Sequence, residues 1–226
     1  MDEGVNMRIA GVDDAGRGSI VGPLVIAGVL FDEKDLPKLV DLHVKDSKLL
    51  SAQRRERLAV EIKKLAIKYH VIKLTPKEID KVVESKRKLH KLNRLEAQAM
   101  AQVIENLKPD IAYVDASDVL AERYKQHLQE CLTFPVQIVS EHKADRKYPI
   151  VSAASIIAKV ERDKAIKELE EKFGEIGCGY PTDPQTISFL QEWLEKYGSY
   201  PDFVRKSWKP AKKLKTRREG KQVRLC

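Results

Sequence analysis

The chain of 226 residues is long enough for one substantial core with a small helical appendage, and 34% of its residues are charged. Its three cysteines are odd in number and widely separated, which excludes a disulfide framework and a zinc knuckle and indicates a reducing cytoplasm. The longest apolar run, residues 20–31, contains Pro23 and is too short to span a bilayer, and Asp2 and Glu3 stand where a signal peptide carries basic residues. We therefore expect a cytoplasmic protein without a membrane partner.

The net charge of +8 is concentrated at the carboxyl end of the chain. Residues 205–226 contain ten Lys or Arg and one acid, whereas the rest of the chain holds 32 basic and 33 acidic residues. Such a basic tail strengthens binding to a polyanion in a salt-dependent and sequence-independent way, although a merely solubilising end has the same composition. Together with carboxylate clusters in the nearly neutral body, the tail indicates nucleic-acid chemistry.

Apolar runs predict five strands, and the first two enclose a turn at residues 16–19. The run from Val21 to Phe31 is nearly continuous, as in a strand that is buried on both faces at the centre of a sheet. Strands and helices then alternate, which implies parallel pairing and an α/β fold with a mixed five-stranded sheet flanked by helices. The strands are predicted at residues 7–12, 21–31, 69–74, 110–114 and 136–140.

The helices are predicted from apolar residues at helical spacing and from capping residues at their starts. Ser51, Thr75 with Glu78, and Ser117 are each placed to cap a helix. The pattern is helical from residue 150 onward and breaks at the Gly- and Pro-containing residues 174–184. The helices are predicted at residues 53–68, from 75, 93–107, 117–132, from 150 and 184–197.

Acidic residues fall where the predicted strands end. Asp13 and Asp14 follow the first strand, Asp115 ends the fourth and Asp145 follows the fifth by a few residues. Neighbouring strands bring such side chains to one edge of the sheet, where several carboxylates are costly unless a divalent cation is bound. Oxygen ligands without His suit Mg²⁺ or Mn²⁺ better than zinc, and two such ions can clamp the attacking water and the leaving oxygen of phosphodiester hydrolysis. The alternative is a charged strand end that only turns the chain.

Six ordered motifs resemble ribonuclease HII, especially its archaeal forms, over about residues 8–210. They are GVDDAGRG at 11–18, DSK at 46–48, YVDA at 113–116, EHKAD at 141–145, SAASIIAKVERD at 152–163 and GYP at 179–181. The resemblance implies a ribonuclease H-like fold and metal-dependent endonucleolytic cutting of RNA in RNA/DNA hybrids. Cutting 5′ of a single ribonucleotide embedded in duplex DNA, with 3′-hydroxyl and 5′-phosphate products, is also implied. We expect a catalytic domain at 1–172, a helical substrate-binding extension at 173–210 and a basic tail at 211–226.

The same resemblance assigns roles to individual residues. It makes Asp13, Asp14, Asp115 and Asp145 the catalytic and metal-binding residues, with Asp13 shared between the ions. It implies that a substrate-binding set reads the ribose 2′-hydroxyl and the phosphates. Taken alone, a Gly-x-Gly, a loop tyrosine and surface lysines are ordinary features. The substrate-binding set is Gly16, Arg17, Gly18, Tyr180, Lys48 and Lys143.

One position departs from the family pattern, which has Glu where this chain has Asp14. The loss of one methylene shortens the reach of the carboxylate by about 1.3 Å, given ordinary bond lengths. Magnesium demands near-octahedral geometry at about 2.0 to 2.1 Å. Asp14 is therefore expected to ligate through a water or after a backbone shift, and Asp14→Glu is expected to keep or raise magnesium-dependent turnover.

Other classes of function remain alternatives to a ribonuclease. A sister nuclease of the same superfamily, such as a junction resolvase, would cut DNA that contains no 2′-hydroxyl. A noncatalytic hybrid-binding protein with a decayed metal site would bind without cutting, and an α/β domain with incidental acids would do neither. For partners, we expect RNA/DNA hybrid and ribonucleotide-containing duplex DNA, a monomer, and no sliding clamp, because residues 222–226 lack the aromatic pair of a clamp-binding peptide.

Overall fold

The computed structural model describes residues 6–44, 50–86 and 91–223, with the side chains described as far as residue 216. The chain forms two compact units that are not consecutive in sequence. The first contains residues 1–15, 25–72 and 92–161, and the second contains residues 16–24, 73–91 and 162–226. These units differ in extent from the division expected at residue 172, which stays a prediction.

A mixed five-stranded sheet in the order β3-β2-β1-β4-β5 confirms the α/β prediction. β1 pairs antiparallel with β2, whereas β1 with β4 and β4 with β5 are parallel, as the alternation of strands and helices implied. The strands are longer or shifted by a few residues, and β1 runs through both adjacent acids. The strands are β1 (Arg8–Ala15), β2 (Leu24–Asp32), β3 (Lys68–Leu74), β4 (Ile111–Asp115) and β5 (Gln137–Glu141).

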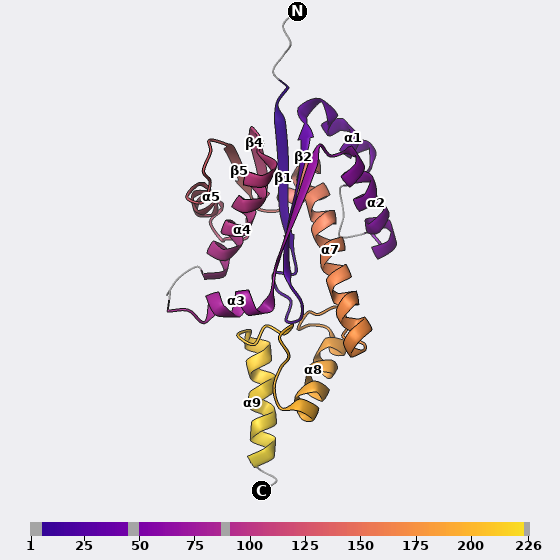
Figure 1. The fold of residues 1–226 in the computed structure, drawn as a ribbon, viewed down its shortest axis with the longest axis vertical. Coiled ribbons are helices and arrows are strands. Elements are labelled where there is room, and N and C mark those ends of the chain that lie inside the picture. Colours follow the sequence, from indigo (N-terminus) through magenta and orange to yellow (C-terminus); the bar gives the residue numbers. More distant parts are fainter. Residues whose placement is uncertain (1–5, 45–49, 87–90, 224–226) are drawn as a thin grey trace, which may run out of the picture. The chain divides into compact units, whose positions relative to one another are not determined.

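Helices lie on both sides of the sheet (Figure 1). A Cβ added at Gly11 of β1 would lie 2.3 Å from the carbonyl oxygen of Ile150 in α7, and one at Gly28 of β2 would lie 2.5 Å from Val103 in α4. The helices are α1 (Leu36–Asp41), α2 (Ala52–Leu65), α3 (Pro76–Val83), α4 (Lys91–Leu107), α5 (Ala121–Gln129), α6 (Ala144–Lys147), α7 (Pro149–Phe173), α8 (Pro184–Tyr197) and α9 (Lys209–Val223), with a 3-10 turn at Glu33–Asp35.

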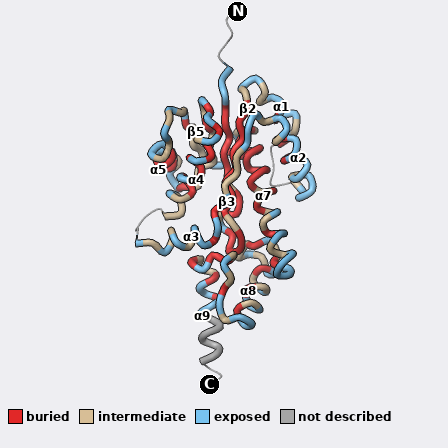
Figure 2. Tube along the Cα trace, viewed as in Figure 1, coloured by how far each residue is buried: buried red, intermediate tan, exposed pale blue. Residues whose placement is uncertain are grey.

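The core of the first unit lies between the sheet and α7, where buried residues follow the strands in Figure 2. It contains Val25, Ala27, Val29 and Phe31 of β2 together with the apolar stripe of α7 that begins at Ile150. Alternate residues of a strand face opposite sides of the sheet, so every second residue of β2 contributes to this core. The helix stripe and the continuous strand were both predicted from the sequence.

Local capping signals were confirmed in two of three cases. The Ser51 hydroxyl accepts a hydrogen bond from Arg54 N at 3.2 Å, and Thr75 with Glu78 forms a capping box at the start of α3. The predicted helix from Ser117 to residue 132 is wrong at its start, because α5 begins at Ala121 without a side-chain cap. Within the described residues, no helix is both long enough and apolar enough to cross a bilayer.

The second unit has its own apolar cluster, formed by residues of the Gly16–Leu24 segment, α7, α8 and α9. The start of the basic tail is packed against the second unit. Residues 209–223 form α9, and Ala211 and Leu214 of this helix are buried in the apolar cluster. The Tyr200 hydroxyl donates to the carbonyl of Ala211 at 2.9 Å. Cys131 in the first unit and Cys178 in the second are free thiols.

Candidate active site

The predicted catalytic acids of the first unit lie at the carboxyl ends of adjacent parallel strands. β1 and β4 are in register as far as Val12 and Val114, and the next residues are Asp13 and Asp115. Asp145 lies in the first turn of α6, which follows β5, the neighbour of β4. Asp13 and Asp145 are buried, with 5% and 6% of their surfaces exposed. The strand order therefore brings three separated acids to one edge of the sheet, as the sequence predicted.

Asp13 and Asp14 point to opposite faces of the sheet, because they are consecutive residues of β1. Asp13 pairs with Ala27, which belongs to the core under α7, and it accepts a hydrogen bond from the Ser155 hydroxyl of that helix. Asp14 instead accepts from the Ser117 hydroxyl at 3.2 Å. The two adjacent carboxylates are thus held by different elements.

Burial raises the pKa of Asp13 well above its usual range, and the charges of Asp14 and Asp115 raise it further. Hydrogen bonds from the Ser155 hydroxyl and from the Asp14 amide, the latter at 2.7 Å, oppose the shift. A nearby positive charge would reverse it, since an opposite charge favours the ionised carboxylate. A bound cation would therefore stabilise the ionised form of Asp13.

Backbone contacts fix the other two acids. Asp115 accepts a hydrogen bond from the amide of Ala144 at 2.9 Å, which connects the end of β4 to the start of α6. The Ser152 hydroxyl of α7 donates to the carbonyl of Asp145. Lys143 adopts the left-handed conformation, with φ of 57°, at the start of α6, and its side chain is exposed.

Ser117, expected to cap a helix, contacts two acids instead. Its hydroxyl lies within hydrogen-bonding distance of Asp14 and of Glu96, a fully buried residue of α4. A capping hydroxyl accepts hydrogen bonds from the amides of the next helical turn, whereas the Ser117 hydroxyl has its one hydrogen directed at carboxylates that are distant in sequence. Glu96 was not recognised as a site residue, because in the sequence it is one acid among the polar residues of a helix.

Three polar side chains of α7 were also not among the predicted site residues. Ser152 and Ser155 are both 1% exposed, and the Lys159 ammonium donates to the Ser155 hydroxyl at 3.0 Å. Their spacing of three and four residues places them on one face of the helix. Polar residues at helical spacing within an apolar stripe are the signal that could have identified them.

The donor set fits a hard divalent cation, although the acids are not arranged as a finished metal site. Within the described ranges, no three His, Cys, Asp or Glu side chains could hold a metal ion as they stand. The ligands offered at this edge are carboxylate and hydroxyl oxygens, which magnesium and manganese prefer. Ionised carboxylates repel one another, and a cation removes the repulsion that raises the pKa of Asp13.

In the second unit, the predicted recognition residues gather around the turn at residues 16–18. Gly16 has φ of +87°, and a Cβ there would lie 2.8 Å from the carbonyl oxygen of Pro23, so the backbone requires glycine. Gly18 has no such requirement, because a Cβ there would meet only Tyr180, at 3.9 Å. Gly18 is exposed and Arg17 is half-buried. The absence of a side chain at Gly18 leaves room beside Tyr180 for a ligand.

Tyr180 is held by a buried arginine that the sequence did not reveal. The Arg162 guanidinium lies 4.8 Å from the centre of the Tyr180 ring, and it donates to the carbonyl of Cys178. The carbonyl of Gly179 accepts hydrogen bonds from Ile20 and Val21 N at 2.8 and 3.1 Å. The structure therefore brings Tyr180 and the 16–18 turn together within the second unit.

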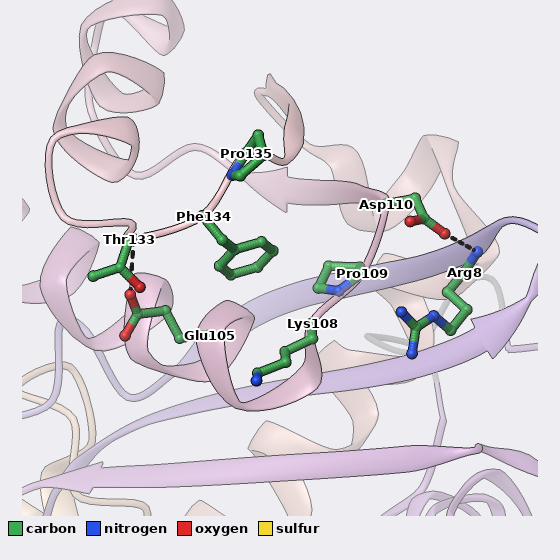
Figure 3. Close-up of a pocket in the computed structure, with 8 residues that line it drawn as sticks. All are labelled: Arg8, Glu105, Lys108, Pro109, Asp110, Thr133, Phe134 and Pro135. Carbon is green, nitrogen blue, oxygen red and sulfur yellow. Dashed lines mark hydrogen bonds between the residues drawn. The ribbon is translucent and has the colours of Figure 1, made fainter.

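Lys48 lies outside the described residues. A separate cavity of about 470 Å³ in the first unit lies where β1 begins and beside the loops before β4 and β5 (Figure 3). Its acids Asp110 and Glu105 accept hydrogen bonds from backbone amides at 2.7 and 2.9 Å. None of the predicted site residues lines this cavity.

Comparison with known proteins identifies the family. A family model for Ribonuclease HII matches residues 10–211. The Ribonuclease HII of Methanocella arvoryzae is 52% identical over 202 residues, which cover 89% of this chain and 88% of that protein. The crystal structure of ribonuclease H2 from Pyrococcus horikoshii OT3 has a TM-score of 0.85 at 44% identity and covers 93% of this chain and 98% of that one. Archaeoglobus fulgidus RNase HII, solved as a complex with PCNA, has a TM-score of 0.82 at 46% identity and covers 91% and 96%. This chain belongs to the ribonuclease HII family, whose members are metal-dependent endoribonucleases that cleave RNA in RNA/DNA hybrids and at embedded ribonucleotides.

Proposed function

We propose that Asp13, Asp14, Asp115 and Asp145 are the catalytic residues of this ribonuclease and that they hold two divalent ions, Mg²⁺ or Mn²⁺. The observation that carries this assignment is the position of Asp13, which is buried at the end of β1 with a pKa raised by burial and by two neighbouring carboxylates. Such an arrangement is unfavourable without a cation and is typical of a functional site.

The protein's own contribution is to fix the carboxylates before substrate arrives. When bound, the ions supply the Lewis acidity that activates a water and stabilises the leaving oxygen of an in-line displacement. Ser155 and the Asp14 amide orient Asp13, while the Ala144 amide orients Asp115. These hydrogen bonds restrict where Asp13 and Asp115 can lie, and binding of the ions would complete the arrangement.

His142 is placed to move a proton near these acids. Its Nδ1 lies 3.3 Å from the carbonyl oxygen of Ala116, the residue after Asp115. A carbonyl only accepts, so Nδ1 is the donor in this hydrogen bond. The side chain is exposed, and we propose that it protonates the leaving oxygen of the cut strand.

We infer that the enzyme cuts on the 5′ side of a ribonucleotide and leaves 3′-hydroxyl and 5′-phosphate ends. The 16–18 turn and Tyr180 would read the ribose 2′-hydroxyl, the group that distinguishes RNA from DNA. The exposed Gly18 next to Tyr180 supports this role, and the exposed Lys143 is suited to a phosphate. In the sequence, only Ala15 separates Asp14 from Gly16.

The test is cleavage of a labelled DNA duplex containing one ribonucleotide, beside an all-DNA duplex, with magnesium, manganese or a chelator. Wild type is expected to cut only the first duplex, 5′ of the ribonucleotide and only with metal. Asp13→Asn and Asp115→Asn should abolish cutting and weaken metal binding measured by calorimetry. Asp110→Asn, an exposed acid at the start of β4, is the matched control and should do neither. Binding without cutting would indicate a decayed site, and cutting of the all-DNA duplex would indicate a resolvase.

We propose a cytoplasmic monomer that acts without a sliding clamp. The free thiols of Cys131 and Cys178 suit a reducing compartment. The A. fulgidus relative was solved with PCNA, but residues 222–226 of this chain carry no aromatic pair. Titration with the sliding clamp of the source organism should therefore show no tight binding, and a stable complex in size-exclusion chromatography would overturn this expectation.

A further inference from the structure

Arg205 is fully buried in the second unit, and its guanidinium donates hydrogen bonds to backbone carbonyls of one short segment. Nη2 donates to the carbonyl of Gly16 at 2.7 Å and Nη1 donates to that of Arg17 at 2.8 Å. Nη2 and Nε also reach the carbonyl of Gly22, at 3.2 and 3.3 Å. The segment from Gly16 to Gly22 is thus gathered around one side chain.

The surroundings hold Arg205 itself in place. Its amide donates to the carbonyl of Ile20 at 2.9 Å, and its guanidinium lies 5.1 Å from the centre of the Trp208 ring. The amide of Gly22 donates to the carbonyl of Phe203 at 2.9 Å, which adds a backbone link beside the side-chain contacts. A buried charge is costly unless its donors are satisfied, and here the carbonyl dipoles and the aromatic face meet that requirement.

These contacts determine where the amides of the turn point. The described part of the chain contains no cis peptide bond, and in a trans peptide the carbonyl and the N–H of the following residue point in opposite directions. Since the Gly16 and Arg17 carbonyls both point at Arg205, the N–H groups of Arg17 and Gly18 point away from it. Two successive N–H groups on one side form a concave site that favours oxygen ligands.

The charge of Arg205 also strengthens these donors. A carbonyl bound to a cation is polarised, and hydrogen bonds in a chain polarise one another, so the N–H of the same peptide becomes a better donor. A guanidinium suits this task because its planar fork presents five donors at fixed angles. A lysine ammonium is a point charge and would not span three carbonyls in the same way.

We propose that Arg205 is a positioning residue for ribonucleotide recognition. It acts from behind the 16–18 turn, holding the amides of Arg17 and Gly18 toward the ribose 2′-hydroxyl and the adjacent phosphate. This inference rests on the proposed role of the turn and of Tyr180. Arg205 lies 189 positions from Gly16 in the sequence, and it acts on the substrate only through the backbone of the turn.

The test compares Arg205→Lys and Arg205→Met with Tyr200→Phe. Tyr200→Phe removes another buried hydrogen bond of the second unit, the one to Ala211, without contacting the turn. For each variant, the KM for a single-ribonucleotide duplex is compared with the inhibition constant of the matched all-DNA duplex. Both constants are measured at a temperature at which thermal melts show that the variant protein is folded. Both Arg205 variants should raise KM at least about tenfold, since a small displacement of a binding group has effects of this size or larger. The inhibition constant should stay unchanged, and Tyr200→Phe should alter neither value.

An unchanged KM in Arg205→Lys would overturn the inference, because the turn would then keep its function without the fork. A parallel rise of both constants would also overturn it, since that pattern reports a general loss of binding. Failure of both variants to fold would show that Arg205 serves folding instead of positioning. If the wild-type protein does not prefer the ribonucleotide duplex, the proposed function itself is refuted. The wild-type measurement therefore separates failure of the proposed function from failure of the inference about Arg205.

Discussion

Gly11→Ala should damage catalysis more than stability, although Gly11 contacts neither substrate nor metal. The added Cβ would lie 2.3 Å from the carbonyl oxygen of Ile150, 2.4 Å from its carbonyl carbon and 2.8 Å from the amide nitrogen of Val151. Favourable contacts begin at about 3.5 Å, so the start of α7 and β1 must separate by roughly 1 Å. All three atoms belong to the helix backbone and cannot rotate aside.

The displaced segment is the part of α7 that carries Ser152 and Ser155, which hold Asp145 and Asp13. Overpacking of this kind costs about 1 to 3 kcal/mol, which for a chain of this size lowers Tm by roughly 2 to 12 °C. A misplacement of about 1 Å in a catalytic array can reduce turnover about a hundredfold. The expected result is a folded protein with a moderately lower Tm and a kcat reduced by about two orders of magnitude.

Gly28→Ala is the matched control on the other face of the sheet. Its Cβ would lie 2.5 Å from Val103 Cγ1 and 2.9 Å from Leu107 Cδ1, which are the ends of side chains that can rotate. It should lower Tm by a similar or smaller amount and leave kcat within about threefold of wild type, because it moves neither serine. Thermal melts and single-turnover cleavage of the ribonucleotide duplex measure both effects. A Gly11→Ala variant with wild-type kcat, or equal losses in the two variants, would refute the argument.

Four other variants test the acids, their hydrogen bonds and the basic tail. The pKa of Asp13 is raised in the folded state, so the metal-free protein should lose stability as pH rises from about 4 through that raised pKa. Asp13→Asn should therefore increase the Tm of the metal-free protein at neutral pH and make that Tm less dependent on pH. An unchanged Tm would contradict this. Ser155→Ala removes a hydrogen bond that lowers the pKa of Asp13, so the acidic limb of the pH–rate profile should move to higher pH, and an unmoved limb would exclude Ser155 from this role. Asp14→Glu should keep or raise magnesium-dependent turnover, and a large loss would show that the site is built around Asp. Replacing Lys212, Lys213 and Lys215 by Gln should weaken binding of ribonucleotide-containing and all-DNA duplexes equally. The slope of log binding constant against log salt concentration should fall by about one for each lysine that neutralises a phosphate. A weaker binding of only one of the two duplexes would contradict a tail that binds without regard to sequence.

The parts of the fold that were predictable depend on signals within a few residues. The Thr75 and Glu78 capping box is complete within four positions, and the continuous apolar run of β2 shows its burial on both faces. The parallel pairing of β1, β4 and β5 follows from alternation of strands and helices, which places acids that end strands at a common edge. Asp13 and Asp115 could therefore be assigned together from the sequence alone.

Contacts between distant residues overrode some of these local signals. Ser117 had the sequence of a cap but is engaged with Asp14 and Glu96, 103 and 21 positions away. α1 was missed because six residues with a proline give too few turns for a periodic pattern. The composition of the basic tail predicted binding to a polyanion and left its structure open, and Ala211 and Leu214 anchor the start of α9 in an apolar cluster.

The residues that organise recognition are the least visible in the sequence for a physical reason. Metal-binding acids reveal themselves because several carboxylates at the ends of neighbouring strands repel one another unless they share a cation. Arg205 instead donates to carbonyls, which every residue has, so nothing in the sequence distinguishes the carbonyls that it binds. Arg162 is partly similar: it donates to the carbonyl of Cys178 and lies over one tyrosine among seven, and its Asp163 contact is to the next residue along the chain. Sequence motifs can therefore identify the groups that meet a substrate, while the side chains that aim backbone groups at it require the structure.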